Sequence, residues 1–333
     1  MKQLEKLVNI PAVSGFEGQG KEGFFELFEK FGLTPKVDEY GNVYGEKKSA
    51  FSQYHILIDA HIDEIGLIVT EVLDGGFLRF ETVGGIDRTN LLCQEVTVLC
   101  EEPLYGVIGA IPPHLAKKGE EKKQEELFID TGLQNAKERI LPGTPVKLNS
   151  SFLRLKNAQL SSGAMDDRGG LLTALMAVKK WKQEVSVTVL GSTREETGLQ
   201  GLELFLKKRS FDLAIVLDVT HGYFKGLSSC RSYPVGEGFT LCYGGILDNS
   251  LTRRLEQELI RREIPYHTEL EPSHPGTNAY CAVMHRIPAI MLSIPLKYMH
   301  TTVETLSEKD IKSLSAFLSG TDWDKMLSER EVF

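Results

Sequence analysis

The sequence predicts an α/β fold in which a small β domain interrupts a larger domain of alternating strands and helices. Four short apolar runs are typical of buried parallel strands, and they cover residues 56–58, 185–190, 213–217 and 289–294. Residues from about 68 to 160 instead carry short β-like runs separated by glycine, proline and charged residues. We therefore expect a discontinuous larger domain of residues 1–67 and 161–333, with residues 68–160 as the insert.

The elements follow in order along the chain. Apolar residues between Phe24 and Phe31 have the spacing of an amphipathic helix, and an extended stretch around Val37 comes next. Inside the insert, β-like runs begin at Phe77, Glu95 and Tyr105. Alternation of strands and helices resumes after residue 161, and helices are expected near residues 171–181, 199–208, 250–262 and 308–318.

Composition excludes several classes of protein. The chain has 333 residues, of which 41% are hydrophobic and 25% charged, as expected of a globular protein with ample material for a core. A formal net charge of -8 offers no general basic field for nucleic acid or for an anionic membrane. No apolar segment approaches the roughly 18 residues of a spanning helix, and we expect no signal peptide because residues 1–6 contain no long apolar core. Five scattered cysteines without a C-x-x-C pair fit a reducing compartment, so we expect a cytoplasmic protein.

Five side chains of the kind that bind metals stand mostly just beyond the apolar runs: His61, Asp166, Glu196, Asp218 and His300. Open α/β sheets place their chemistry beyond the carboxyl ends of the strands, which would gather these distant residues into one pocket. Taken singly, an acidic residue after a strand is more often a helix cap or a solvated charge. The collective pattern favours a functional site.

Two motifs suggest how such a site is built. In His61-Ile62-Asp63, alternate residues of an extended segment share a face, so the Asp63 carboxylate can approach one imidazole nitrogen while the other nitrogen faces a metal. In SGAMDDRGG, residues 162–170, Asp166 and Asp167 precede the glycines that begin an apolar helix. Helix capping, or a local ion pair with Arg168, explains one acid and leaves the other free to bridge metals.

The third motif is STREETGLQG, residues 192–201, where Glu195 and Glu196 would point in different directions if the segment were extended. Two tasks follow from this arrangement, metal binding for one carboxylate and proton transfer for its neighbour. The alternative is an acidic first turn of the helix that begins near Leu199. Asp218 closes the run 213–217, and His300 follows the last predicted strand.

These residues and the motifs around them carry a resemblance to a known family. The chain resembles, over essentially its whole length, the glutamyl aminopeptidase or tetrahedral-aminopeptidase family of co-catalytic metallopeptidases, sometimes labelled endoglucanase-like. The matching motifs are SGFE (14–17), YGN (40–42), AHIDEIG (60–66), GVIGAIPPH (106–114), LFIDTG (127–132), AMDDR (164–168), EETGLQG (195–201) and LDVT (217–220). The resemblance implies a zinc-peptidase-like mixed central sheet flanked by helices, with a small β-barrel-like insert.

The resemblance also implies the roles of the site residues. One divalent metal ion would be bound by His61, Asp166 and Asp218, and a second by Asp166, Glu196 and His300. Glu195 would be the general base, and Asp63 would orient His61. Three carboxylates nearly balance two divalent cations, and the oxygen and nitrogen donors suit zinc first, with cobalt or manganese as alternatives.

The expected function is removal of N-terminal residues from peptides with a free N-terminus. The insert would mediate dimerisation, and the dimers would assemble into a dodecamer. Relatives often read GGTDA where this chain has Pro275 and Asn278, proline is common at the position of Phe239, and proline is usual where Thr302 stands. Because an amide in place of a carboxylate changes which charges a pocket tolerates, the preferred N-terminal residue does not transfer.

Three alternatives stay open. A metal-dependent deacylase or amidohydrolase acting on small N-acyl compounds would use the same water attack. A glycoside hydrolase could use two carboxylates but needs no pair of metals. A non-enzymatic scaffold with vestigial ligands would bind no stoichiometric metal. Outside the site, His114 is expected in a structural turn and residues 117–126 in a solvated loop.

Overall fold

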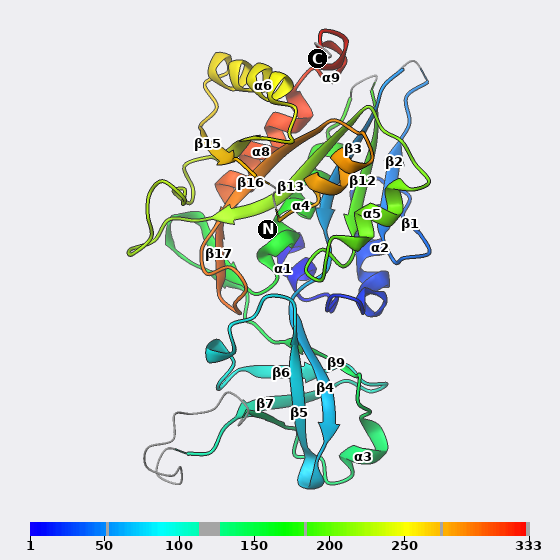
Figure 1. Cartoon of the computed structure of the whole chain (residues 1–333), viewed down its shortest axis with the longest axis vertical. Coiled ribbons are helices and arrows are strands. Elements are labelled where there is room, and N and C mark those ends of the chain that lie inside the picture. The colour runs from blue at the N-terminus through cyan, green and yellow to red at the C-terminus, as the bar shows by residue number, and fades with distance from the viewer. Residues whose placement is uncertain (51–52, 113–126, 183–184, 274–275, 331–333) are drawn as a thin grey trace.

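The computed structural model describes residues 1–50, 53–112, 127–182, 185–273 and 276–330. Within these residues, a mixed sheet flanked by helices forms one part of the molecule, and a closed β-barrel forms the other (Figure 1). The expectations for His114, Pro275 and the loop 117–126 concern residues outside the described ranges. Every helix in the described part is too short or too polar to span a lipid bilayer.

The large sheet contains eight described strands, and its centre is parallel. In spatial order the strands are β1 (Lys36–Val37), β2 (Val43–Lys47), β12 (Ser186–Ser192), β3 (His55–His61), β13 (Leu213–His221), β16 (Ala289–Leu296), β14 (Phe239–Gly244) and β15 (Tyr266–Glu271). Strand β2 runs antiparallel to β12, and β14 runs antiparallel to β16, so the sheet is mixed. Parallel order in β12, β3, β13 and β16 brings their carboxyl ends to one edge.

Helices cover both faces of this sheet, which explains why its central strands are continuously apolar. On β3, Ile56 and Ile58 pack in the cluster that includes Leu175 of α4, whereas Leu57 between them packs with Phe205 of α5 on the opposite face. The helices are α1 (Lys2–Val8), α2 (Lys21–Lys30), α3 (Ala136–Arg139), α4 (Met165–Lys179), α5 (Gln200–Leu206), α6 (Asn249–Arg261), α7 (Ala279–Met284), α8 (Glu308–Gly320) and α9 (Trp323–Ser328).

The barrel closes in the order β4-β5-β8-β7-β6-β9. Its strands are β4 (Gly66–Val72), β5 (Phe77–Val83), β6 (Glu95–Val98), β7 (Leu104–Gly109), β8 (Phe128–Asp130) and β9 (Pro145–Leu148). Side chains alternate between inside and outside, so that Ile108 of β7 is buried while Tyr105 and Val107 of the same strand are exposed. A separate three-stranded sheet contains β10 (Leu153–Arg154), β11 (Gln159–Ser162) and β17 (Glu304–Ser307).

A buried ion pair joins the barrel to the rest of the molecule. The Lys147 ammonium of β9 contacts the Glu64 carboxylate at 2.5 Å and also donates to the carbonyl of Val8 at 3.3 Å. The second Glu64 oxygen accepts from the amide of Ala12 at 2.9 Å. One carboxylate therefore ties the barrel to the amino-terminal segment.

The predicted fold class is confirmed, and the differences concern short elements. Helix α4 begins at Met165, several residues before the predicted start, and its first turn contains Asp166 and Asp167 in non-helical backbone conformations. Helices α1, α7 and α9 have six or seven residues each, which is fewer than the periodic window that a sequence pattern needs. Strands β14 and β15 were likewise not predicted.

Candidate metal centre

The five predicted metal-ligand side chains come from segments that meet at the carboxyl edge of the parallel strands. His61 is the last residue of β3, and Asp218 lies within β13. Asp166 belongs to the first turn of α4, Glu196 lies between β12 and α5, and His300 follows β16. All of these positions are where an open α/β sheet forms its site.

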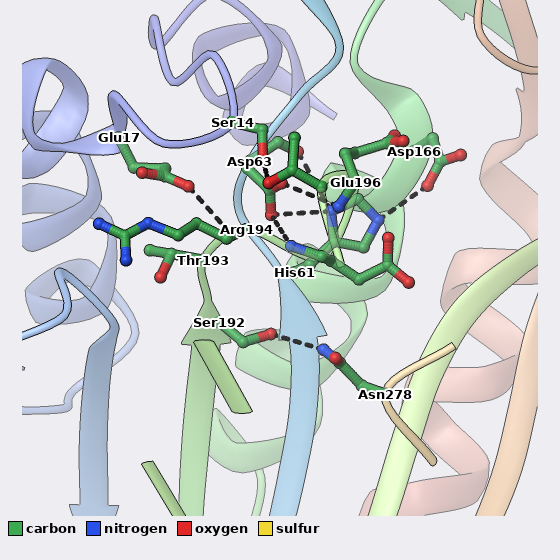
Figure 2. Close-up of polar contacts among 12 residues, drawn as sticks. Ser14, Glu17, His61, Asp63, Asp166, Ser192, Thr193, Arg194, Glu196 and Asn278 are labelled. Atoms are coloured by element: carbon green, nitrogen blue, oxygen red, sulfur yellow. Dashed lines mark hydrogen bonds and ion pairs between the residues drawn. The ribbon is translucent and has the colours of Figure 1, made fainter. Parts of the chain in front are cut away.

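The side chains form two groups that share one carboxylate. Ligand atoms of His61, Asp166 and Asp218 all lie within 4.8 Å of one another, and so do those of Asp166, Glu196 and His300. Asp166 Oδ1 lies 2.9 Å from His61 Nε2, and its Oδ2 lies 3.5 Å from His300 Nε2. Glu196 Oε1 is 3.3 Å from the same His300 nitrogen. The two oxygens of Asp166 thus face two different histidines (Figure 2 shows the His61 side).

Asp63 connects His61 to the two adjacent glutamates. His61 Nδ1 lies 3.1 Å from the Asp63 carbonyl and 3.5 Å from its carboxylate Oδ1. The Asp63 carboxylate also accepts hydrogen bonds from the amides of Glu195 at 3.0 Å and Glu196 at 3.1 Å (Figure 2 labels Asp63 and Glu196). Although burial opposes ionisation, the contact with His61 lowers the pKa of Asp63. An ionised Asp63 therefore positions both the histidine and the glutamate backbone.

The segment that carries the glutamates is a turn, not the extended stretch that would send their side chains in opposite directions. Arg194 has a φ of 55°, in the left-handed region. Its amide donates to Glu17 Oε1 at 2.9 Å (Figure 2). The hydroxyls of Ser14 and Thr197 lie 2.9 Å apart. The amino-terminal segment thus fixes the turn, a role for Glu17 that the residue pattern alone did not reveal.

Glu304 is the second residue that sequence reasoning missed. This buried carboxylate accepts from the amides of Met165 at 2.8 Å and Asp166 at 3.2 Å through Oε2, and from the amide of His300 at 2.7 Å through Oε1. It joins the backbones of two predicted ligands. An ionisable residue that opens the otherwise uncharged strand β17 is the signal that could have identified it.

The barrel side of the molecule also reaches the site. His300 Nδ1 lies 2.8 Å from the carbonyl of Gly85, which follows barrel strand β5. A backbone carbonyl at this distance favours the tautomer that leaves Nε2 free to accept a metal. The orientation of His300 therefore depends on a residue outside the large sheet.

The converging side chains line a cavity of about 360 Å³. Its lining comprises His61, Gly85, Asp166, Glu195, Glu196, Asp218, Val219, Gly276, Thr277, Met299 and His300. A larger cavity of about 820 Å³ lies beside α6 and is lined by arginines such as Arg253 and Arg286. Neither ligand group touches that larger cavity, so the smaller one is the candidate site.

Burial and crowding perturb the charges in the site. Burial raises the pKa of Glu195 to about 9, and burial together with Asp166 raises the pKa of Asp218 to about 7. Burial alone would lower the pKa of His300, but Asp166 and Glu196 raise it to about 11. Buried carboxylates outnumber the histidines that face them, and such a site is stabilised by divalent cations. The donor set of carboxylate oxygens and imidazole nitrogens fits them.

The turn beside the cavity is held by Asn278. Its Nδ2 donates to Asp59 Oδ2 at 2.8 Å and to Ser192 Oγ at 2.9 Å (Figure 2 shows the Ser192 contact), and all three side chains are buried. Burial raises the pKa of Asp59 to about 6. The Asn278 amide thus donates to one oxygen of this carboxyl, whereas an aspartate at position 278 would bring two carboxyl groups together.

Comparison with known proteins relates the whole chain to one group. A putative aminopeptidase of Escherichia coli, SgcX, is 32% identical over 338 residues, with 92% of this chain and 89% of that protein covered. An aminopeptidase of the archaeon Desulfurococcus kamchatkensis has a similar structure, with a TM-score of 0.89, 29% identity, and coverage of 99% and 97%. The TET1 peptidase of Pyrococcus horikoshii, which can assemble into a tetrahedron or a large octahedral shell, gives a TM-score of 0.83, 29% identity, and coverage of 96% and 97%. Residues 41–317 match the family described as M42 glutamyl aminopeptidase, and the chain belongs to that family.

Proposed function

We propose that this protein is a metal-dependent aminopeptidase that removes residues one at a time from the N-terminus of peptides. The observation that carries the proposal is the pair of ligand groups that share Asp166, beside a buried Glu195 in one cavity. Membership of the M42 glutamyl aminopeptidase family supports the same activity.

The residues divide into two ligand sets for two divalent ions. His61, Asp166 and Asp218 would hold one ion, and Asp166, Glu196 and His300 the other. Zinc suits these donors, and cobalt or manganese could replace it. When bound, the ions supply Lewis acidity that lowers the pKa of water and polarises the scissile carbonyl.

Glu195 would act as the general base. Its carboxyl lines the same cavity, so it can take a proton from the attacking water and later deliver it to the leaving amine. Burial raises its pKa to about 9, and cations nearby would favour the ionised form that a base requires. Asp63 would keep the Glu195 backbone and the His61 ring in place.

The proposed substrate is a peptide with a free N-terminus, and the proposed assembly is a homo-oligomer. We propose that residues 68–160 form the domain through which subunits associate. The barrel exposes apolar side chains that an association could cover, with Tyr105 81% exposed and Leu141 67% exposed. A concentration-independent monomer in light scattering would rule out the assembly.

Replacement of Glu195 tests the base. Glu195→Gln should lower kcat by about 10²–10⁴-fold, because proton transfer is lost while the size of the side chain is kept. Bound metal, measured by elemental analysis, should be unchanged. Glu237→Gln is the matched control, because Glu237 is exposed and outside the cavity. Wild-type turnover by Glu195→Gln would show that another group is the base.

A substrate comparison tests the reaction class. Metal-free protein reconstituted with zinc, cobalt or manganese should hydrolyse aminoacyl-anilides with a free amine and leave their N-acetylated forms intact. Faster hydrolysis of the N-acetylated compounds would instead indicate a deacylase. Full activity in the metal-free protein would contradict the proposed chemistry altogether.

A further inference from the structure

We infer that this enzyme prefers large apolar residues at the substrate N-terminus, and that the side chain enters a preformed cavity next to the candidate metal centre. The inference rests on the proposed aminopeptidase function. This cavity has a volume of about 470 Å³, within the roughly 300–1,000 Å³ that is usual for ligand pockets. It adjoins the metal-centre cavity, because Met299 lines both.

The lining of the cavity is mainly apolar. The apolar side chains are Phe224, Leu227, Leu296, Tyr298 and Met299, and the rings of Phe224 and Tyr298 pack with their centroids 5.1 Å apart. Leu227 is 39% exposed and Tyr298 43% exposed, so both present apolar surface that a ligand could cover. A hydrocarbon side chain bound here would therefore be removed from water together with these residues.

Hydrogen bonds hold the cavity wall in place without a ligand. The Gly222 amide donates to the Leu296 carbonyl at 2.7 Å, and the Tyr223 amide donates to the Tyr233 carbonyl at 2.7 Å. Ser232 Oγ donates to the Ser228 carbonyl at 2.8 Å, which closes the turn behind Leu227. A preformed wall suits the side chain of the N-terminal residue, which has a limited size. It suits the rest of the peptide less well, because the length of that part varies.

The second apolar space at the site is smaller. It has a volume of about 170 Å³, and Ile86, Leu91 and His300 are among the residues that line it. The cavity of about 470 Å³ is lined by Met299 and by His221, the last residue of the strand β13 that carries Asp218. We therefore assign the cavity of about 470 Å³ to the side chain of the N-terminal substrate residue.

Charge disfavours ionic N-terminal residues. Among the residues that the structure describes, no Asp or Glu lines the cavity of about 470 Å³, so a lysine side chain would find no ionic partner there. The polar residues that line this cavity are His221, Ser228 and Arg231. Arg231 is exposed, and pairing a substrate carboxylate with an exposed arginine should raise kcat/KM by only about fivefold. Each methylene buried in an apolar pocket changes kcat/KM by about 10–200-fold, so the preference for apolar residues should prevail.

The test compares N-terminal residues on one leaving group. Anilides of leucine, phenylalanine, alanine, glutamate and lysine are assayed with the metal-loaded protein, and kcat/KM is measured for each. Leucine and phenylalanine should exceed the other three by at least about tenfold. A glutamate or lysine anilide that ranks first would overturn the inference. Selectivity for the second residue of dipeptides, with none for the first, would overturn it as well.

Two variants locate the preference in this cavity. Leu227→Asp should lower the ratio of kcat/KM for the leucine anilide over the alanine anilide by at least about tenfold. The same variant should raise kcat/KM for the lysine anilide relative to the alanine anilide, because a carboxylate now faces the substrate side chain. Leu270→Asp makes the same change at an exposed leucine on β15, outside both cavities, and should leave the ratio unchanged. An equal ratio in both variants would overturn the assignment.

Two further outcomes are distinguishable. If Leu227→Asp changes the mass in light scattering but not the leucine-to-alanine ratio, the surface is a subunit interface and the inference fails. If no free-amine anilide is hydrolysed at all, including the alanine compound that needs no side-chain cavity, the proposed function fails and the inference with it.

Discussion

Asp166 belongs to both ligand groups of the candidate site. Its two carboxylate oxygens face His61 and His300, and its amide donates to Glu304. Burial opposes its ionisation, yet the contacts with His300 and His61 keep its pKa below the usual range. An ionised aspartate between two histidines is suited to bridging two cations, which is why the whole proposal depends on this side chain.

Metal affinity should increase with pH. In the metal-free protein the pKa of His300 is raised to about 11, despite its burial, by Asp166 and Glu196, and the pKa of Asp218 is raised to about 7 by burial and Asp166. Both groups hold protons at neutral pH that metal binding must displace, so binding releases protons and tightens between pH 6 and 8. Titration calorimetry in two buffers of different ionisation enthalpy measures the release. Proton uptake, or an affinity independent of pH, would contradict this view.

Glu304 should act on metal binding without touching the metal. Glu304→Gln replaces one acceptor oxygen by a donor next to the amides of Met165, Asp166 and His300. Loss of such supporting contacts typically weakens metal affinity about 10–100-fold. The measurement is a competitive titration against a chelating dye, with Glu71→Gln on the exposed barrel surface as control. Unchanged affinity would limit Glu304 to a structural role.

At the residue scale, the sequence predicted which side chains would gather but not what holds them. The structure brings the five ligand-type residues together, and their roles stay proposals. Glu17 and Glu304 were not recognised because each acts through backbone amides, and a sequence shows nothing about which amides lack partners.

At the scale of elements, parallel strands determine where the site can form. Strands β3 and β13 pair in parallel, and so do β13 and β16, so His61, Asp218 and the segment before His300 reach the same edge. Helix α4 packs across these strands and brings Asp166 to that edge at its first turn. The rigid sheet and this helix together fix the distances between the ligands.

Packing of α4 is therefore a stability prediction at this scale. Leu175 of α4 is fully buried, so Leu175→Ala should destabilise the protein by about 2–5 kcal/mol through lost burial and a cavity. Ile260 of α6 is 62% exposed, and Ile260→Ala should fall within about 0.5 kcal/mol of wild type. Urea unfolding of both variants checks the difference. Equal midpoints would mean that α4 is not part of the core.

The sequence predicted the long elements because their patterns extend over many residues. Helices α6 and α8 lie within two residues of their predicted ranges. The short helix α9 was missed because two turns give too few periodic positions, although Asp322 caps it by accepting from the amide of Lys325 at 3.1 Å. Local capping chemistry, not periodicity, defines such an element.

At the scale of the whole molecule, the barrel and the large sheet meet close to the site. Gly85 orients His300 from the barrel side, while Lys147 of β9 contacts Glu64, one residue after Asp63. The division into a catalytic domain and an inserted association domain remains a prediction. These contacts nonetheless give the barrel a direct influence on the candidate centre.

Breaking the buried ion pair should be costly. Lys147→Met leaves the Glu64 carboxylate buried without its cation, which typically destabilises a protein by about 3–5 kcal/mol. Lys137→Met breaks an exposed pair with Asp74 and should change stability by no more than about 1 kcal/mol. Adding Glu64→Gln to Lys147→Met should recover part of the loss, because the unpaired charge is gone. No recovery in urea unfolding would show that packing, not charge, explains the effect.

The most direct test of the central claim is anomalous diffraction at the zinc edge from crystals of the zinc-loaded protein. The account predicts two fully occupied peaks, one on each side of Asp166. The first should lie between His61 and Asp218, and the second between Glu196 and His300. A single peak, or two peaks bound away from Asp166, would contradict it.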